Sequence, residues 1–93
     1  MDNRDEIGCL GVSRAGHDCN EIYVIINSDS EYVYLADGKS KTVDKPKKKK
    51  KKHVQIIFHI DKAINEKLSQ NKLLINEDIK RAIKLYKNKL KLI

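Results

Sequence analysis

The residues best suited to chemistry in this chain of 93 amino acids are lysines gathered in one short stretch. Six are consecutive, at residues 47–52, and three more stand just before them. Such a block of ammonium groups is typical of a protein that binds a polyanion. Because lysine is a point charge without the bidentate fork of arginine, the block favours contact with phosphates over reading of bases.

Charge is unevenly distributed along the chain. Residues 1–38 carry two arginines against eight acidic residues, and residues 39–53 carry nine lysines against one aspartate. Residues 54–93 carry nine basic residues against four acidic ones, and the formal net charge of the whole chain is +7. An acidic first part followed by a basic belt and a basic tail predicts an oriented field instead of a uniformly basic surface.

Histidine and cysteine offer a second kind of chemistry, but their spacing argues against it. No Cys-x-x-Cys pair occurs, and Cys9, Cys19, His17, His53 and His59 match no zinc finger or ribbon. Cys19 lies two residues from His17, yet the sequence offers no third group to orient the pair and no oxyanion hole. We therefore expect no metal, no cofactor and no catalytic centre.

Length and composition predict one small domain, close to the lower size limit at which a core forms unaided. The first residues hold no apolar stretch long enough for a signal peptide, so we expect a reducing compartment without a structural disulfide. No apolar run approaches the ~20 residues of a membrane span. The expectation is a monomeric cytoplasmic protein that has no contact with membranes.

Apolar alternation and β-branched residues predict five short strands, at residues 7–13, 21–27, 32–35, 40–43 and 53–58. Asp37 and Gly38 predict a two-residue hairpin turn between the third and fourth strands. Pro46 has no N–H to donate and is expected to end that pairing, which leaves the lysine run as a loop beside the sheet edge. Five closely spaced strands favour a small barrel, because closure removes exposed edges.

Helical periodicity replaces alternation after Asp61. Asp61 predicts the cap of a helix over residues 62–70, and Asn76 predicts the cap of a second over 77–90. The first is too short to persist alone in water, so we expect a helical hairpin that packs on the barrel. The domain boundaries are then 1–58 for the barrel with its lysine run and 59–93 for the hairpin. The second helix carries a basic stripe typical of a solvated face, formed by Lys80, Lys84, Lys87 and Lys91.

The segment 8–26, GCLGVSRAGHDCNEIYVII, resembles a KOW motif, in which a strand leads through a glycine-centred turn into a strongly apolar strand. Gly16 takes the glycine position. The continuation, YVYLADGKSKTVDKPKKKKKKHV, resembles small bacterial KOW-domain proteins related to large-subunit ribosomal proteins of archaea and eukaryotes. The segment departs from the pattern in two ways: Asn20 stands for a second glycine, and His17 and Cys19 stand where basic residues are usual. The resemblance implies an SH3-like barrel that binds RNA in or near ribosomal or transcription complexes.

The sequence thus predicts a mostly β domain with α, a five-stranded SH3-like (KOW) barrel followed by a C-terminal helical hairpin. We expect a non-catalytic protein that binds structured or ribosomal RNA through phosphate contacts. The expected contact residues are Arg14, His17, Lys39, Lys41, Lys45, Lys47, Lys48, Lys49, Lys50, Lys51 and Lys52.

Two alternatives stay open at this point. The chain is alternatively a protein-interaction module that docks in a ribosomal or transcription complex, where its lysines meet an acidic protein surface. In addition, Tyr23, Tyr32 and Tyr34 are candidates for a base-stacking platform, although we expect at least one of them to pack in the core.

Overall fold

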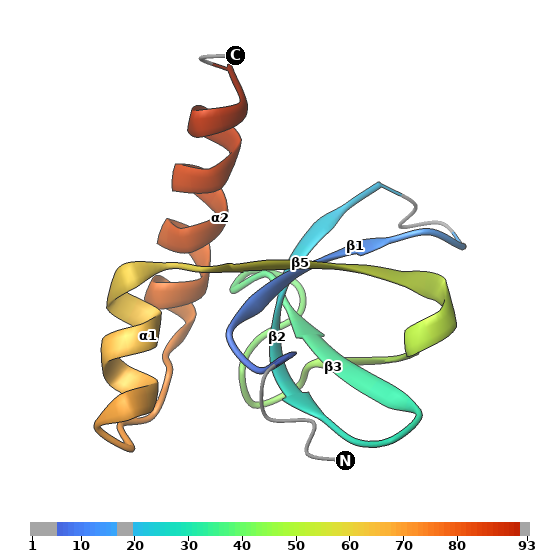
Figure 1. Ribbon diagram of the computed structural model, residues 1–93, viewed down its shortest axis with the longest axis horizontal. Helices are drawn as coiled ribbons and strands as arrows, with labels where there is room; N and C mark the ends of the chain where they lie inside the picture. Colours follow the sequence, from blue (N-terminus) through green and yellow to red (C-terminus); the bar gives the residue numbers. More distant parts are fainter. Residues whose placement is uncertain (1–5, 17–19, 92–93) are drawn as a thin grey trace.

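The computed structural model describes residues 6–16 and 20–91, with the side chain of residue 91 left out (Figure 1). Five strands are followed by two helices, and a short 3₁₀ helix, η2, lies between the last two strands. Their bounds are β1 Cys9–Ser13, β2 Ile22–Ser28, β3 Tyr32–Ala36, β4 Lys47–Lys50, η2 Lys51–His53, β5 Val54–Ile60, α1 Lys62–Ser69 and α2 Asn76–Lys91. The structure confirms both predicted helices and four of the five predicted strands, and β5 extends two residues past the predicted boundary at residue 58.

All five strands lie in one antiparallel sheet with the order β4-β3-β2-β1-β5. In a flat sheet, strands about 4.8 Å apart would place the two edges about 19 Å from each other. The chain passes from β4 to β5 through η2 alone, and four Cα–Cα steps reach at most about 14 Å. The sheet is therefore strongly curled. Its described residues show no ladder between β4 and β5, so it is open in its hydrogen bonding.

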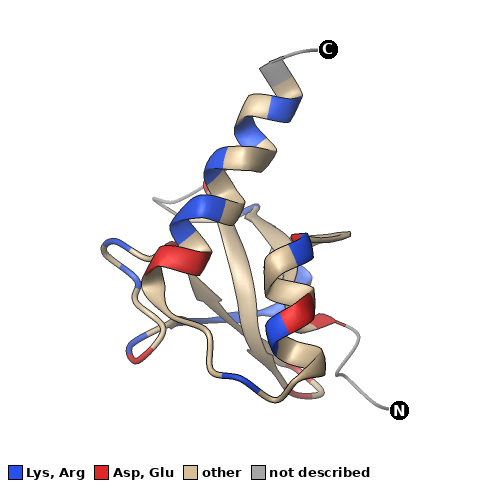
Figure 2. Cartoon of the chain, turned by 90° about the vertical axis from the view of Figure 1, so that its left-hand side faces the viewer, with Lys and Arg blue, Asp and Glu red and all other residues tan. Residues whose placement is uncertain are grey.

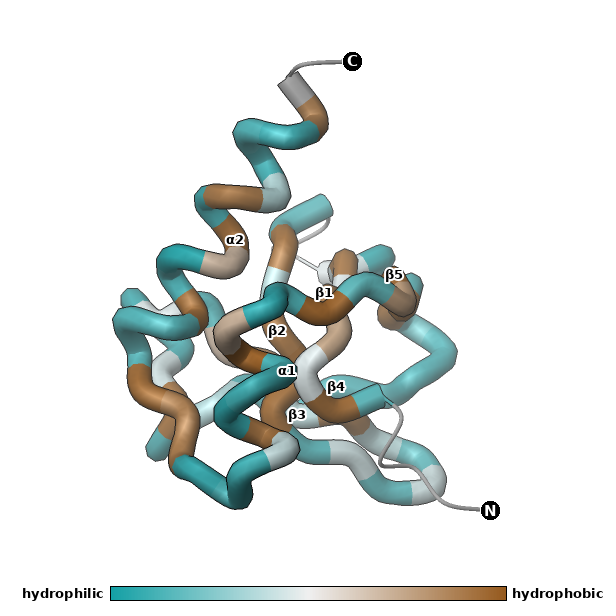
Figure 3. The backbone as a smooth tube through the Cα atoms, turned by 60° about the vertical axis from the view of Figure 1, so that its left-hand side comes forward, coloured by the Kyte–Doolittle hydropathy of each residue, from teal (hydrophilic) through white to brown (hydrophobic). Residues whose placement is uncertain are grey.

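Apolar side chains line both faces of the curled sheet, because successive residues of a strand point to opposite sides. On β2, Tyr23 and Ile25 pack in one cluster while Val24 packs in the other. The first cluster lies between strands and contains Cys9, Tyr23, Ile25, Val33, Leu35 and Val54. The second joins the sheet to the two helices and contains Leu10, Val24, Ala36, Ile64, Ile79, Ala82 and Ile83. Hydrophobic and hydrophilic segments alternate along α1 and α2 (Figure 3).

The predicted fourth strand at residues 40–43 is wrong, and so is the two-residue hairpin turn. The partner of β3 is the lysine run itself, which pairs from Leu35 opposite Lys47 to Tyr32 opposite Lys50. Lysine is a poor strand former, but register with the apolar β3 decides the outcome here. The first four lysines of the run are therefore a paired edge strand and not a loop, and the last two lie in η2. Pro46 directly precedes this strand and does not end one.

Residues 37–46 form a loop whose first part is closed by the carboxylate of Asp37. Asp37 accepts hydrogen bonds from the N–H groups of Lys39 and Lys41, at 2.8 and 2.9 Å. The carbonyl of Lys41 in turn accepts from the N–H groups of Asp37 and Gly38, at 2.8 and 3.1 Å. Gly38 has a φ of +80°, whereas Asp37 is not among the described residues with positive φ. Local bonds of this kind compete with a sheet ladder, and here they replace it.

An aspartate carboxylate accepts backbone N–H groups at the start of each helix, although only one of the two predicted caps is correct. Asp61 caps α1 as predicted, accepting from the N–H groups of Ala63 and Ile64 at 3.1 and 3.2 Å. Asn76 does not cap α2: it is the first helical residue, and its side-chain oxygen accepts the N–H of Val43 at 2.9 Å. The start of α2 is held instead by Asp78, which accepts the N–H of residue 75 at 3.0 Å, as in a capping box.

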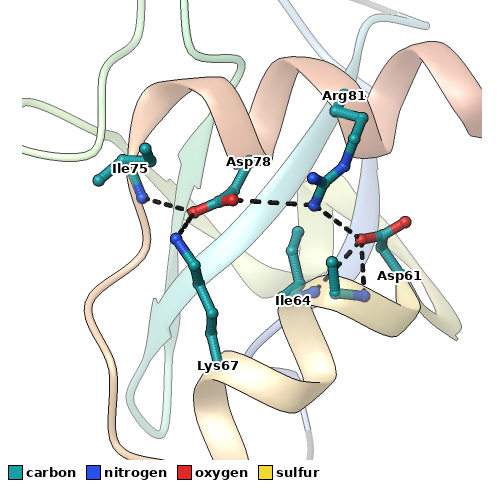
Figure 4. Close-up of polar contacts among 7 residues, drawn as sticks. Asp61, Ile64, Lys67, Ile75, Asp78 and Arg81 are labelled. Carbon is teal, nitrogen blue, oxygen red and sulfur yellow. Dashed lines mark hydrogen bonds and ion pairs between the residues drawn. The ribbon is translucent and has the colours of Figure 1, made fainter.

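Asp78 also joins the two helices (Figure 4). Lys67 of α1 donates to it at 2.6 Å, and Arg81 lies between Asp78 and Asp61 at 3.7 and 3.5 Å. Burial by itself would raise the pKa of Asp78. The hydrogen bonds from Lys67 and Ile75 and the charges of Lys67 and Arg81 outweigh burial and lower it below the ordinary 3.8. Asp78 is therefore a buried, paired carboxylate that stabilises the helical hairpin.

We expect Asp78→Asn to lower the free energy of unfolding at pH 7 by about 1–3 kcal/mol, because the Lys67 ammonium loses its charged partner. Asn keeps an acceptor for the N–H of Ile75, so the substitution isolates the charge. Since the folded pKa lies below the unfolded value, the stabilisation is present above pH 4 and is lost as pH falls through the folded pKa. Urea unfolding of both proteins at pH 7 and pH 2.5 should show the difference shrinking in acid. An equal difference at both pH values would contradict the role given to this ion pair.

The loop after β3 packs tightly on the first turn of α2, and this predicts the behaviour of Gly38. A Cβ atom there would lie 2.6 Å from the carbonyl oxygen of Asn76 and 2.7 Å from Cγ of Lys80. The backbone carbonyl cannot move away without shifting α2. Both Gly38→Ala and Gly38→Asn should therefore lower the thermal midpoint. For Gly38→Ala, the left-handed backbone strain alone should lower the free energy of unfolding by about 1–2 kcal/mol.

The Gly38→Asn variant distinguishes a steric need for glycine from a need for positive φ, because asparagine tolerates positive φ. If Gly38 were needed only for its φ, Gly38→Asn would be nearly harmless. Gly16 provides the matched control, since it is exposed and has a φ of +85°. Gly16→Asn should leave the midpoint close to that of the wild type. A tolerated Gly38→Asn would show that the loop does not press on α2.

Candidate nucleic-acid interface

The pleat of β4 divides the lysine run between the two faces of the sheet. Residues directly opposite each other in an antiparallel pair point to the same side. Lys49 stands opposite Val33, a buried residue of the inter-strand cluster, and therefore points inward with it. Lys48 and Lys50 stand opposite Tyr34 and Tyr32 and point the other way. Exposure follows the same alternation, half-buried at residues 47, 49 and 51 and exposed at 48, 50 and 52.

Two half-buried lysines of the run are engaged within the protein. Lys49 donates from Nζ to Oγ of Ser13 and to the carbonyl of Ala15, both at 2.6 Å. Ser13 is fully buried at the end of β1, so this ammonium links the edge strand β4 to β1 across the curl of the sheet. Lys51 pairs with Glu6 at 2.9 Å, and its side chain is 21% exposed. These two lysines support the fold.

The outward-facing lysines lie beside two tyrosines. Nζ of Lys48 is 4.3 Å from the ring centroid of Tyr32, which is a cation–π contact. The hydroxyl of Tyr34 donates to Asp29 at 3.5 Å. Lys50 is exposed, and within residues 6–16 and 20–91 no hydrogen bond or ion pair engages its side chain. We name Lys48, Lys50, Tyr32 and Tyr34 the β3–β4 face.

Asp29 is the acidic neighbour of the β3–β4 face and holds the turn before β3. It accepts the N–H groups of Tyr32 and Glu31 at 2.6 and 2.8 Å. These bonds, helped by the charges of Lys48 and Lys51, lower the pKa of Asp29 below its ordinary value. Asp29 is therefore ionised at neutral pH, and it orients Tyr34 while it offsets part of the local positive charge.

The remaining predicted contact residues do not gather on the β3–β4 face. Arg14 is exposed just after β1, where Nη1 donates to the side chain of Asn20 at 3.4 Å. Lys41 and Lys45 lie in the loop of residues 37–46, half-buried and exposed respectively, and Lys52 is exposed on η2. His17 lies outside the described residues.

Lys39 instead contributes to a second basic feature, a cleft of about 620 Å³ between the loop after β3 and α2. Lysines of α2 line the opposite wall, and the basic residues along this helix are visible in Figure 2. Glu21 and Asp37 also line the cleft, and Lys80 pairs with Glu77 at 3.1 Å, so its charge is partly offset. The lining lysines are Lys39, Lys80, Lys84 and Lys87. Helical spacing indicated the stripe on α2, but no sequence pattern joined it to Lys39.

The histidines and cysteines form no metal-binding cluster in the described part of the chain. Cys9 is buried in the inter-strand cluster, and Cys19 lies outside the described residues. Among residues 6–16 and 20–91 no three His, Cys, Asp or Glu side chains are grouped so that they could hold a metal ion. The ring of His59 packs on Tyr86 with centroids 5.8 Å apart. Tyr23 is 5% exposed in the inter-strand cluster, as expected for at least one of the three candidate tyrosines.

Comparison with known proteins adds no relative: no protein-family model matches the chain, and no curated protein matches it significantly. Neither described helix is long and apolar enough to cross a membrane. The KOW resemblance therefore rests on the sequence motifs alone.

Two neighbouring lysines test the division of the run. Lys49→Met removes an ammonium that bonds to Ser13 and Ala15, whereas Lys50→Met removes the same charge from an exposed site. We expect Lys49→Met to lower the free energy of unfolding by about 1–3 kcal/mol and Lys50→Met to change it by less than about 0.5 kcal/mol. Chemical denaturation measures both, and equal effects would refute the assignment of inward and outward lysines.

Proposed function

We propose that the protein binds RNA without catalysis, through phosphate contacts made by the outward-facing lysines of the run. The observation that carries the proposal is the strand β4, which holds Lys48 and Lys50 on the exposed side of a folded sheet and is followed by Lys52 on η2. Residues two apart on a strand are about 6.7 Å from each other. The charges thus form a spaced row on a rigid element instead of a freely moving tail.

The chemistry of these side chains favours the RNA backbone over base edges. Ammonium groups contact phosphate oxygens and fix the position of the chain, while sequence reading needs planar donors and acceptors in a defined geometry. Affinity of this kind falls steeply with salt, because each contact releases condensed counterions. Lys49 and Lys51, which are bonded within the protein, contribute indirectly, by holding the segment that presents the others.

The KOW resemblance belongs to the same proposal. A strongly curled sheet of five antiparallel strands is compatible with an SH3-like barrel, and its inter-strand cluster is the kind of core that such a barrel needs. On this proposal the protein works in or near a ribosomal or transcription complex, as a monomer with RNA as its partner. The helical hairpin would then brace the sheet by packing on the face that the second cluster occupies.

Replacing Lys48, Lys50 and Lys52 together by glutamine should weaken RNA binding and flatten its salt dependence. Loss of three phosphate contacts lowers the magnitude of the slope of log K against log salt by about 2 on single-stranded RNA. Fluorescence anisotropy with labelled RNA at several salt concentrations measures the slope.

The matched control is the triple replacement of Lys84, Lys87 and Lys89 on α2 by glutamine, which removes the same charge from exposed helical positions. Glutamine is a good helix former, so α2 should keep its stability. We expect the control to change the slope by less than half as much. Equal slopes for the two variants would show that RNA binding depends on the overall charge of the protein and not on the lysine run. If the wild-type chain binds no RNA, the protein-interaction alternative is favoured.

A further inference from the structure

The β3–β4 face combines aromatic rings and cations in one register. Tyr32 lies opposite Lys50 and Tyr34 opposite Lys48, so all four side chains leave the sheet on the same side. Strands are about 4.8 Å apart, and residues two apart on one strand are about 6.7 Å apart. The four residues therefore form a compact group at the edge of the sheet.

The two rings are not taken up by the described core. Ala36 shares their side of β3 and packs with α1 and α2, whereas neither Tyr32 nor Tyr34 belongs to the two buried clusters of the described residues. Both tyrosines are half-buried, in contrast to Tyr23. The helical hairpin thus packs at the Ala36 end of β3, and the rings lie on the part of this face beyond it.

The contacts of the rings leave them accessible and oriented. The exposed, flexible side chain of Lys48 lies over one face of Tyr32. Its ammonium can leave this ring and bind a phosphate instead. Tyr34 is oriented through its hydroxyl by Asp29, which is itself fixed by two backbone N–H groups. Holding a ring in place before binding reduces the entropy lost when a flat ligand stacks on it.

We propose that the β3–β4 face is a stacking platform for an unpaired segment of RNA. Bases stack on Tyr32 and Tyr34, and the flanking phosphates lie against Lys48 and Lys50. The inference rests on the proposed RNA binding and names its substrate class. Every base has a π-face, so the platform is tolerant of sequence. The bases of a duplex are already stacked on each other, so it selects unpaired loops and ends over helical RNA.

The test compares two RNA probes that carry the same number of phosphates, an unstructured 24-nucleotide strand and a duplex of two 12-nucleotide strands, each strand with a 5′-phosphate. Wild-type protein should bind the unpaired strand more tightly. Base–aromatic stacking contributes about 1–3 kcal/mol per base, so Tyr34→Leu should weaken binding of the strand about 5- to 150-fold. Tyr32→Leu should act likewise, and neither variant should change duplex binding by more than about twofold.

Tyr34→Phe is the matched control, because it keeps the ring and removes only the bond to Asp29. We expect it to bind the unpaired strand within about threefold of the wild type. Thermal midpoints show whether each variant is folded. Ultraviolet crosslinking of the wild-type complex, mapped by mass spectrometry, gives a measurement that needs no substitution: crosslinked bases should map to the peptide that contains Tyr32 and Tyr34.

The outcomes separate this inference from the function on which it rests. If the wild type binds neither probe, the proposed RNA binding is wrong. If it binds both probes equally, or if the Leu variants bind the unpaired strand as tightly as the wild type, RNA binding stands and the platform is refuted. Crosslinks that map to Tyr86 on α2 would likewise refute the platform.

Discussion

The fold depends on the three-residue connection η2, which joins the two edge strands of the sheet. Strands β4 and β5 occupy opposite edges of the sheet, yet only the three residues of η2 separate them in the chain. A flat sheet is incompatible with that link, because its edges would be about 19 Å apart. Curling brings β4 toward the end of β1, where the Lys49 ammonium binds Ser13 and Ala15. It also turns the other face of β4, with Lys48 and Lys50, toward solvent.

One strand therefore serves stability and, on our proposal, the recognition of RNA. An exposed edge strand is a liability, since its free N–H and C=O groups can pair with another chain, and lysines on an edge oppose such pairing by repulsion. In β4 the same charges are sorted by the pleat: the inward ones bond to the protein, and the outward ones stand beside Tyr32 and Tyr34. Repulsion among consecutive lysines is reduced because neighbours point to opposite sides and Glu6 and Asp29 lie close by.

Features of the fold that depend on local chemistry could be predicted from the sequence. The β-branched run gave β2 within one residue at each end, and Asp61 identified the start of α1. Patterns decided by tertiary contacts could not. Asp37 and Gly38 look like a hairpin turn, but the Asp37 carboxylate closes a longer loop and Gly38 fits against Asn76. The lysine run carries no apolar alternation, so nothing local revealed a strand, a register or the division of its six charges.

Lysine footprinting tests the central claim, that the pleat divides the run, in one experiment. The protein is treated with limiting acetylating reagent, alone and with an unpaired RNA strand, and modification at each lysine is followed by mass spectrometry. Without RNA, Lys49 should react much more slowly than Lys50 and Lys52. Added RNA should protect Lys48, Lys50 and Lys52 and leave Lys89 on α2 unchanged. Uniform reactivity along residues 47–52 would contradict the division, and protection confined to α2 would contradict the location of the interface.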